Sequence, residues 1–146
     1  MIHLNIGSNL NSNFGSRFDN ISICINLLIS SKVKLIKISN FYETPSYPNN
    51  NFSKYINVGV LSIYEGNYQK LLRIIKLIEK RLGRIKTKKN DPRTIDIDII
   101  DFNGLVKKTN DLVFPHPRSH LRNFVLYPIL ENDPKWSHPI LNKNAQ

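Results

Sequence analysis

Residues 94–100 constrain the fold of this chain more than any other segment, because acidic and β-branched residues alternate along them. Neighbouring side chains of a β-strand point to opposite faces of a sheet, so Asp96 and Asp98 would share one face and the isoleucines around them the other. The isoleucine face has to be covered, which predicts a strand within a layered fold. The two carboxylates would lie about 7 Å apart at Cα, close enough to hold metal ions between them.

The chain has the size and composition of one globular domain. Its 146 residues can form a hydrophobic core, and a hydrophobic content of 40% argues against disorder. No apolar run approaches the roughly 18 residues that cross a bilayer, and the first residues lack the basic and apolar regions of a secretion signal. The single cysteine, Cys24, cannot form an internal disulfide, which fits a reducing cytosol. We expect a cytoplasmic monomer with one domain over residues 1–146.

The chain is strongly basic, with a formal net charge of +10 and a pI of about 9.8. Such a charge is typical of nucleic-acid binding, but it also arises by compositional drift in a sequence rich in Ile, Asn and Lys. A local cluster is more specific, because it directly precedes the acidic strand, where a polyphosphate would need neutralising. This cluster consists of Arg81, Arg84, Lys86, Lys88, Lys89 and Arg93.

Apolar periodicity predicts the other elements of the fold. Alternation predicts strands over Ile2–Ile6, Val33–Tyr42 and Tyr55–Ile63. Helical spacing predicts one helix from a cap at Ser12 or Asn13 to about Ser30, and a second from Asn67 to about Leu82, ended by Gly83.

The order of these elements is β-α-β-β-α-β, with the acidic strand last. This order predicts an α+β fold, a ferredoxin-like antiparallel sheet with helices on one face. A turn at Asn103-Gly104 ends the acidic strand. Beyond it, five of the eight prolines fall between Pro115 and Pro139, so we expect an irregular C-terminal segment with a short helix near His120–Phe124.

Three residues near the acidic strand each have a functional and an ordinary interpretation. Strand alternation places Arg93 on the isoleucine face, so it reaches the acids only if the chain twists before the strand, and is otherwise a surface arginine. His116 lies between two prolines, which could aim its ring at a phosphate, or it is an ordinary loop histidine. Glu79 lies at the edge of an apolar helical stripe, where an ion pair with a lysine of the same helix is the simplest interpretation.

A second pattern suggests a place for a flat ring. Tyr55 and Asn57 share one face of their strand, and Phe124 follows in the C-terminal segment. Two aromatic faces and an amide that both donates and accepts hydrogen bonds suit the edge of a heterocycle. The alternative is a core aromatic residue and a strand asparagine without a ligand.

Taken together, these stretches resemble the 6-hydroxymethyl-7,8-dihydropterin pyrophosphokinase family of folate biosynthesis over nearly the whole chain. The ordered set is far more specific than any single motif. It comprises Ile6–Leu10, Phe41–Pro45, Tyr55–Asn57, Glu79 through Gly83-Arg84, Pro92–Ile100, Pro115–Arg118, Arg122–Leu126 and Trp136–Pro139.

The resemblance implies a reaction and a role for individual residues. The family transfers the β,γ-pyrophosphoryl group of ATP to the hydroxymethyl group of the pterin and releases AMP. Asp96 and Asp98 match the ligands of two Mg²⁺ ions, and Arg84 and Arg93 match the catalytic arginines. The implied ATP contacts are Glu79, Lys86, His116 and Arg122, and the implied pterin contacts are Thr44, Pro45, Tyr55, Asn57 and Phe124.

The approach to the acidic strand departs from the family pattern. Asn90 and Asp91 stand where an aromatic residue and a glycine are usual, and the loop is one residue shorter. Lysines replace arginines at some basic positions of this loop, which keeps the charge but loses the bidentate fork of arginine. Asp91 also places a negative charge beside the expected polyphosphate.

Two other functions remain open on the sequence. A basic ferredoxin-like domain with aromatic residues on its sheet is typical of RNA binding, but two acids facing phosphates would oppose it. Another Mg²⁺-dependent transferase with an Asp-x-Asp motif would explain the acids but not Tyr55, Asn57 and Phe124. We expect the pyrophosphokinase, acting on ATP and the pterin without a nucleic-acid or membrane partner.

Overall fold

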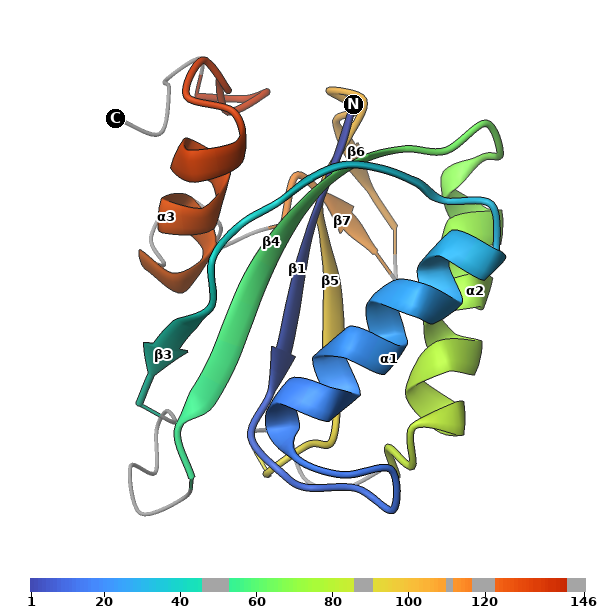
Figure 1. Cartoon of the computed structure of the whole chain (residues 1–146). Coiled ribbons are helices and arrows are strands. Elements are labelled where there is room, and N and C mark those ends of the chain that lie inside the picture. Colours follow the sequence, from blue (N-terminus) through green and yellow to red (C-terminus); the bar gives the residue numbers. More distant parts are fainter. Residues whose placement is uncertain (46–52, 86–90, 110–111, 117–122, 142–146) are drawn as a thin grey trace.

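The computed structural model describes residues 1–45, 53–85, 91–109, 112–116 and 123–141, with the backbone alone for residues 123 and 124. In this part of the chain one antiparallel sheet has the strand order β2-β4-β1-β5, and β3 also pairs with β4 (Figure 1). Its strands are β1 (Ile2–Ser8), β2 (Lys34–Ile38), β3 (Tyr42–Thr44), β4 (Tyr55–Ile63) and β5 (Asp96–Phe102). This strand order is that of the ferredoxin-like plan, so the predicted α+β fold is confirmed.

Helices flank the sheet on both sides. Helices α1 (Arg17–Ser30) and α2 (Tyr68–Arg81) cover one face, and α3 (Asn123–Asn132) lies on the other side, against β4 (Figure 1). Two short strands, β6 (Lys107–Lys108) and β7 (Val113–Phe114), pair with each other beyond β5. In the described ranges, no helix has both the length and the apolar character needed to cross a membrane.

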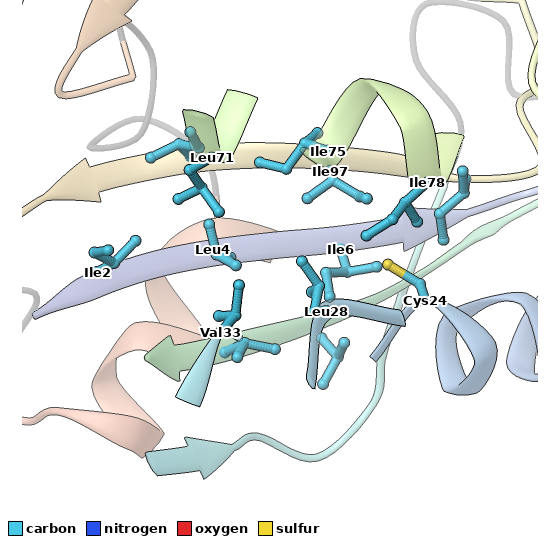
Figure 2. Packing of buried hydrophobic residues seen from close by; sticks show 14 of the residues in the cluster. Ile2, Leu4, Ile6, Cys24, Leu28, Val33, Leu71, Ile75, Ile78 and Ile97 are labelled. Carbon is cyan, nitrogen blue, oxygen red and sulfur yellow. The ribbon is translucent and has the colours of Figure 1, made fainter. Parts of the chain in front are cut away.

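The main core lies between the sheet and the first two helices. Alternate residues of β1, such as Leu4 and Ile6, point into it together with Ile97 of β5 (Figure 2). Cys24 of α1 is fully buried among them, as expected for a small core residue, and burial raises the pKa of its thiol. Burying one aliphatic side chain of this size stabilises the fold by about 1.5–3 kcal/mol, and a one-residue slip would expose the whole set.

Two element boundaries agree with the sequence prediction. Strand β4 has the predicted bounds, and α2 begins directly after Asn67, the predicted first residue, whose side chain caps the helix by accepting from the Lys70 N–H at 2.9 Å. The turn after β5 is also confirmed, with φ of 54° at Asn103 and 75° at Gly104.

The start of α1 was predicted wrongly. The helix is capped by Ser16, whose hydroxyl accepts from the Asp19 N–H while the Asp19 carboxylate accepts from the Ser16 N–H at 2.8 Å. Ser12 instead lies in a turn and accepts from the Phe14 N–H at 3.1 Å. Ser16 has an acidic residue three positions later, whereas the predicted caps Ser12 and Asn13 do not, so only Ser16 can form the reciprocal pair.

The predicted strand Val33–Tyr42 is two strands, β2 and β3, interrupted around Ser39. The Ser39 hydroxyl accepts from the Gly59 N–H at 2.8 Å, and the Ser39 N–H donates to the Gly59 carbonyl at 2.9 Å. A side-chain oxygen therefore replaces one backbone acceptor of the ladder, and the edge strand bends at this residue.

The two helices of the predicted plan cover one face of the sheet, and the C-terminal segment adds a third helix on the other face. Helix α3 continues to Asn132 and contains Pro128. A Cβ atom at Gly59 would lie 2.4 Å from the Cβ of Pro128, so a glycine in β4 lets the helix approach the sheet. A second small core lies beneath it, made by Ile100, Val125, Ile129 and Trp136.

Candidate active site

The sheet face opposite α1 and α2 carries polar side chains where β5 begins. Asp96 pairs in register with Gly7 of β1, and Gly7 pairs on its other side with Asn57 of β4. Two residues further along both strands, on the same face, Asn5 pairs with Asp98. Ile97 and Ile99 of β5 enter the main core on the opposite side, so the predicted alternation is confirmed from Asp96 to Ile99 and both carboxylates share this face. Ile100 packs instead in the small core beneath α3.

Two arginines from different segments contact Asp96. Its Oδ1 lies 3.1 Å from Nη1 of Arg84, and its Oδ2 lies 3.3 Å from Nη1 of Arg93. The exposed fractions of these three side chains are 23–27%, so a ligand from solvent can reach them. Partial burial also strengthens the ion pairs relative to those on an open surface.

Glu79 of α2 holds Arg84 beside Asp96. Its Oε2 accepts from Nη1 of Arg84 and from the Ile97 N–H at 3.1 Å. Gly83, with a φ of 86°, ends the helix and turns the chain, so that the Arg84 N–H donates to the Glu79 carbonyl at 3.0 Å. Burial raises the pKa of the Glu79 carboxyl, and the nearby Arg84 opposes this shift. The ordinary interpretation of Glu79, as the partner of a lysine on its own helix, is therefore wrong.

Arg93 reaches the acids although strand alternation would place it on the isoleucine face. Strand β5 begins only at Asp96, and residues 91–95 have no strand conformation. Alternation therefore does not extend back to Arg93, and its guanidinium turns towards Asp96. The predicted placement of Arg93 on the isoleucine face was therefore wrong. The chain twists before β5, which is the condition under which Arg93 was expected to reach the acids.

The candidate ring-binding residues lie next to this cluster. The Asn57 Nδ2 donates to Oγ1 of Thr44 at 3.0 Å, and Thr44 pairs in register with Tyr55. Burial raises the pKa of the Tyr55 phenol, with a further contribution from the Asp96 charge. The Tyr55 ring lies next to Gly7, the register partner of Asp96, because a Cβ atom at Gly7 would lie 3.4 Å from Cδ1 of Tyr55. Pro45 follows β3 directly and is exposed.

His116 lies on the segment that follows β7. Its backbone N–H donates to the Ile100 carbonyl at 2.9 Å, which fixes this segment to β5 two residues beyond Asp98. The predicted residues Lys86 and Arg122 lie outside the described ranges. Phe124 belongs to the first turn of α3, but its side chain lies outside the description.

The donor chemistry of the cluster suits a hard cation. Among the described residues of the cluster, the three carboxylates of Glu79, Asp96 and Asp98 outnumber the two guanidiniums of Arg84 and Arg93, which leaves a formal charge of −1. In the described ranges, no three His, Cys, Asp or Glu side chains form a group that could hold a metal ion. Mg²⁺ often takes one or two carboxylates and completes its shell with water and phosphate oxygens, so Asp96 and Asp98 fit it in the presence of a phosphate-bearing substrate.

Sequence reasoning missed the contribution of the last residues of β1 and of Asn9, which follows it. A Cβ atom at Gly7 would lie 2.7 Å from Oδ1 of Asn57 and 3.4 Å from Cδ1 of Tyr55, so the glycine leaves room for both side chains. Asn9 is bonded to the backbone of Arg93. The Gly7-Ser8-Asn9 sequence indicated only a turn, and the signal for its wider role was its place in the family motif.

The fold defines a structural class, the ferredoxin-like α+β domains, here with acids and arginines gathered on the sheet face opposite α1 and α2. A more specific assignment comes from comparison with known families. The chain belongs to the 7,8-dihydro-6-hydroxymethylpterin-pyrophosphokinase family, whose model matches residues 3–134.

Similar proteins occur in eukaryotes and bacteria. The folic acid synthesis protein FOL1 of Dictyostelium discoideum is 40% identical over 144 residues, covering 97% of this chain and 21% of that protein. The 2-amino-4-hydroxy-6-hydroxymethyldihydropteridine pyrophosphokinase of Aquifex aeolicus is 35% identical, covering 97% of this chain and 86% of that protein. The protein of the same name from Bacillus subtilis is 35% identical, covering 84% and 74%. The chain therefore spans about a fifth of the first relative and most of the other two.

Proposed function

We propose that this chain transfers a pyrophosphoryl group from ATP to 6-hydroxymethyl-7,8-dihydropterin, giving AMP and the pterin diphosphate, a step of folate biosynthesis. The observation that supports it most is the adjacency of two groups on one sheet face. Asp96, which contacts both arginines, pairs in register with Gly7, and a Cβ atom at Gly7 would lie 3.4 Å from Cδ1 of Tyr55. A polyphosphate and a flat polar ring could therefore bind side by side.

The arginines would act on the transferred group. Such a transfer depends on in-line geometry and charge neutralisation more than on covalent chemistry. Each guanidinium has five N–H donors, and the ion pairs to Asp96 and Glu79 use only part of them. The remaining donors of Arg84 and Arg93 can therefore bind phosphate oxygens without leaving Asp96.

Asp96 and Asp98 would hold the two Mg²⁺ ions expected for the family. When bound, the metal neutralises phosphate charge and aligns the reacting oxygens. The formal charge of −1 on the described cluster supports this proposal, because the acids would otherwise repel ATP. Glu79, Lys86, His116 and Arg122 are the further residues that we propose for the ATP side.

The pterin would bind beside Asn57. An amide donates and accepts at the same time, as the edge of a pterin ring requires. We propose that Tyr55 and Phe124 contact the two ring faces, and that Thr44 and Pro45 contact the ring edge through their backbone.

The test is AMP formation from ATP with Mg²⁺, in the presence and absence of 6-hydroxymethyl-7,8-dihydropterin. We expect AMP only when the pterin is present. The RNA-binding alternative predicts steeply salt-dependent RNA binding without AMP formation, and that outcome would reject the proposal. Another transferase with an Asp-x-Asp motif would leave the pterin unreacted.

We further propose that the protein acts as a cytoplasmic monomer without nucleic acid. The buried lone thiol of Cys24 fits a reducing compartment. Light scattering after size exclusion tests the oligomeric state, and a stable dimer would contradict the proposal.

A further inference from the structure

The asparagine that follows β1 is buried and bonded to a proposed catalytic residue. Asn9 is 1% exposed. Its Oδ1 accepts from the Arg93 N–H at 2.8 Å, and its own N–H donates to the Arg93 carbonyl at 3.1 Å. Both backbone polar groups of Arg93 are therefore bonded to one residue.

These two hydrogen bonds fix the backbone of Arg93, as the hydrogen bonds of the sheet fix the backbone of Asp96. The register of β1 with β5 ends at Gly7 and Asp96. Arg93 lies three residues before Asp96, in a segment without strand conformation. Since Pro92 carries no N–H, the backbone just before Arg93 can donate no bond of its own. The Asn9 contacts connect Arg93 to β1 beyond the last ladder pair.

The same side chain joins a second part of the site. The Nδ2 of Asn9 donates to the Ser53 carbonyl at 3.3 Å, two residues before Tyr55. A neighbouring asparagine, Asn20 of α1, donates to the Thr94 carbonyl at 3.1 Å. Asn9 therefore connects the backbone of Arg93 with the segment that leads into β4. Asn20 fixes Thr94, the residue that follows Arg93.

We propose that Asn9 is a positioning residue for pyrophosphoryl transfer, one that fixes the Arg93 backbone so that the guanidinium is presented at Asp96 and the phosphates. This inference rests on the proposed function. Small displacements of a group that acts on the transition state lower the rate strongly, so the effect belongs to kcat rather than to ATP binding.

The test is a double-mutant cycle with Asn9→Ala, Arg93→Ala and the double variant, each assayed for kcat and for the KM of ATP. We expect Asn9→Ala to lower kcat about tenfold or more, with less than about a twofold change in the KM of ATP. In the Arg93→Ala background, Asn9→Ala should lower kcat by less than about twofold, because the group it positions is gone. Equal losses of kcat in both backgrounds, or an unchanged kcat in Asn9→Ala, would overturn the proposal.

Asn67→Ala is the matched control, because it removes an asparagine that caps α2 and bonds to Lys70. We expect it to lower the denaturant midpoint without changing kcat, which separates lost stability from lost positioning. If Asn9→Ala does not fold, the cycle is run with Asn9→Ser, whose shorter side chain keeps a buried hydroxyl but cannot reach the Arg93 N–H. If the unmodified chain forms no AMP, the proposed function fails; if it is active and the losses are additive, only the role of Asn9 fails.

Discussion

The sheet face opposite α1 and α2, called the polar face here, has acidic residues at both ends of β5. The site end, around Asp96, is open to solvent, whereas the covered end, around Asp101, lies beneath the segment that follows α3. At the site end, Asp96 pairs with arginines and remains 24% exposed. At the other end, Asp101 and His3 are 5% and 3% exposed. There, Nε1 of Trp136 donates to Oδ2 of Asp101 at 2.8 Å, and Nε2 of His3 lies 3.2 Å from Oδ2 of Asp133.

This difference indicates that burial by the segment after α3 decides whether an acidic side chain of β5 is available to a ligand or serves the stability of the fold. The chain that follows α3 supplies both Trp136 and Asp133, so the far end is satisfied within the protein. Asp98 and Asp101 lie three residues apart on one strand. We therefore expect substitution of the first to affect the reaction and substitution of the second to affect stability.

The largest expected effect is that of Asp98→Ala on turnover. A carboxylate that holds Mg²⁺ supports several kcal/mol of charge stabilisation, so AMP formation should fall by about 10³-fold or more. The variant should remain folded, with a cooperative urea transition. AMP assays and urea titration test the two expectations. Near-normal turnover of the folded variant would remove the argument for a metal site.

Arg93→Ala should have the next largest effect. Losing a donor that acts on developing charge lowers kcat by about 10²-fold, and the KM of ATP should change by less than about threefold. Steady-state kinetics with varied ATP separate the two quantities. If only the KM of ATP rose, Arg93 would be a docking residue and the comparison with the covered end would weaken.

At the covered end, Asp101→Ala should act on stability. The substitution removes the acceptor of the Trp136 Nε1–H and of the Gly104 N–H, which lies 2.9 Å from Oδ1. An unpaired buried donor costs about 1–3 kcal/mol, so the urea midpoint should fall by a matching amount. At saturating substrates kcat should stay within about threefold. A loss of AMP formation as large as that of Asp98→Ala would contradict the division between the two ends.

Local patterns predicted those parts of the fold that depend on local physics. Tyr55–Val60 and Asp96–Ile99 alternate between two kinds of side chain, and the two faces meet different surroundings, so alternation and environment agree. The cap at Asn67 was predictable for the same reason, because it depends on residues within one helical turn.

The remaining features depend on contacts between distant residues. Nothing in the sequence around Pro128 indicates that Gly59, far away in the chain, makes room for it. The backbone N–H of Arg93 donates to Asn9, which is 84 positions away. In the site, the acids and their shared face were predictable from alternation, whereas the clustering of Glu79, Arg84 and Arg93 on them depends on tertiary structure.

Gly7→Ala should change pterin binding at the site end. The added Cβ would lie 2.7 Å from Oδ1 of Asn57, so the amide has to move. We expect the KM of the pterin to rise about tenfold, equivalent to about 1.4 kcal/mol, with the KM of ATP as the internal control. An unchanged KM of the pterin would show that Asn57 does not contact the ring edge.

The smallest expected effect concerns acid stability at the covered end. Burial lowers the pKa of His3 from 6.5, and the contacts with Asp133 oppose this shift. Below pH 6.5 the unfolded chain therefore binds a proton that the folded chain resists, so the free energy of unfolding falls as the pH drops from 6.5 towards the lowered pKa. His3→Gln should flatten this slope by up to about 1 kcal/mol between pH 7 and 5, as measured by urea titration at each pH. Because His3 contacts the segment after α3, this result would locate the acid-sensitive part of the polar face at the covered end. Equal dependence of the unfolding free energy on pH in the unmodified chain and in His3→Gln would contradict it.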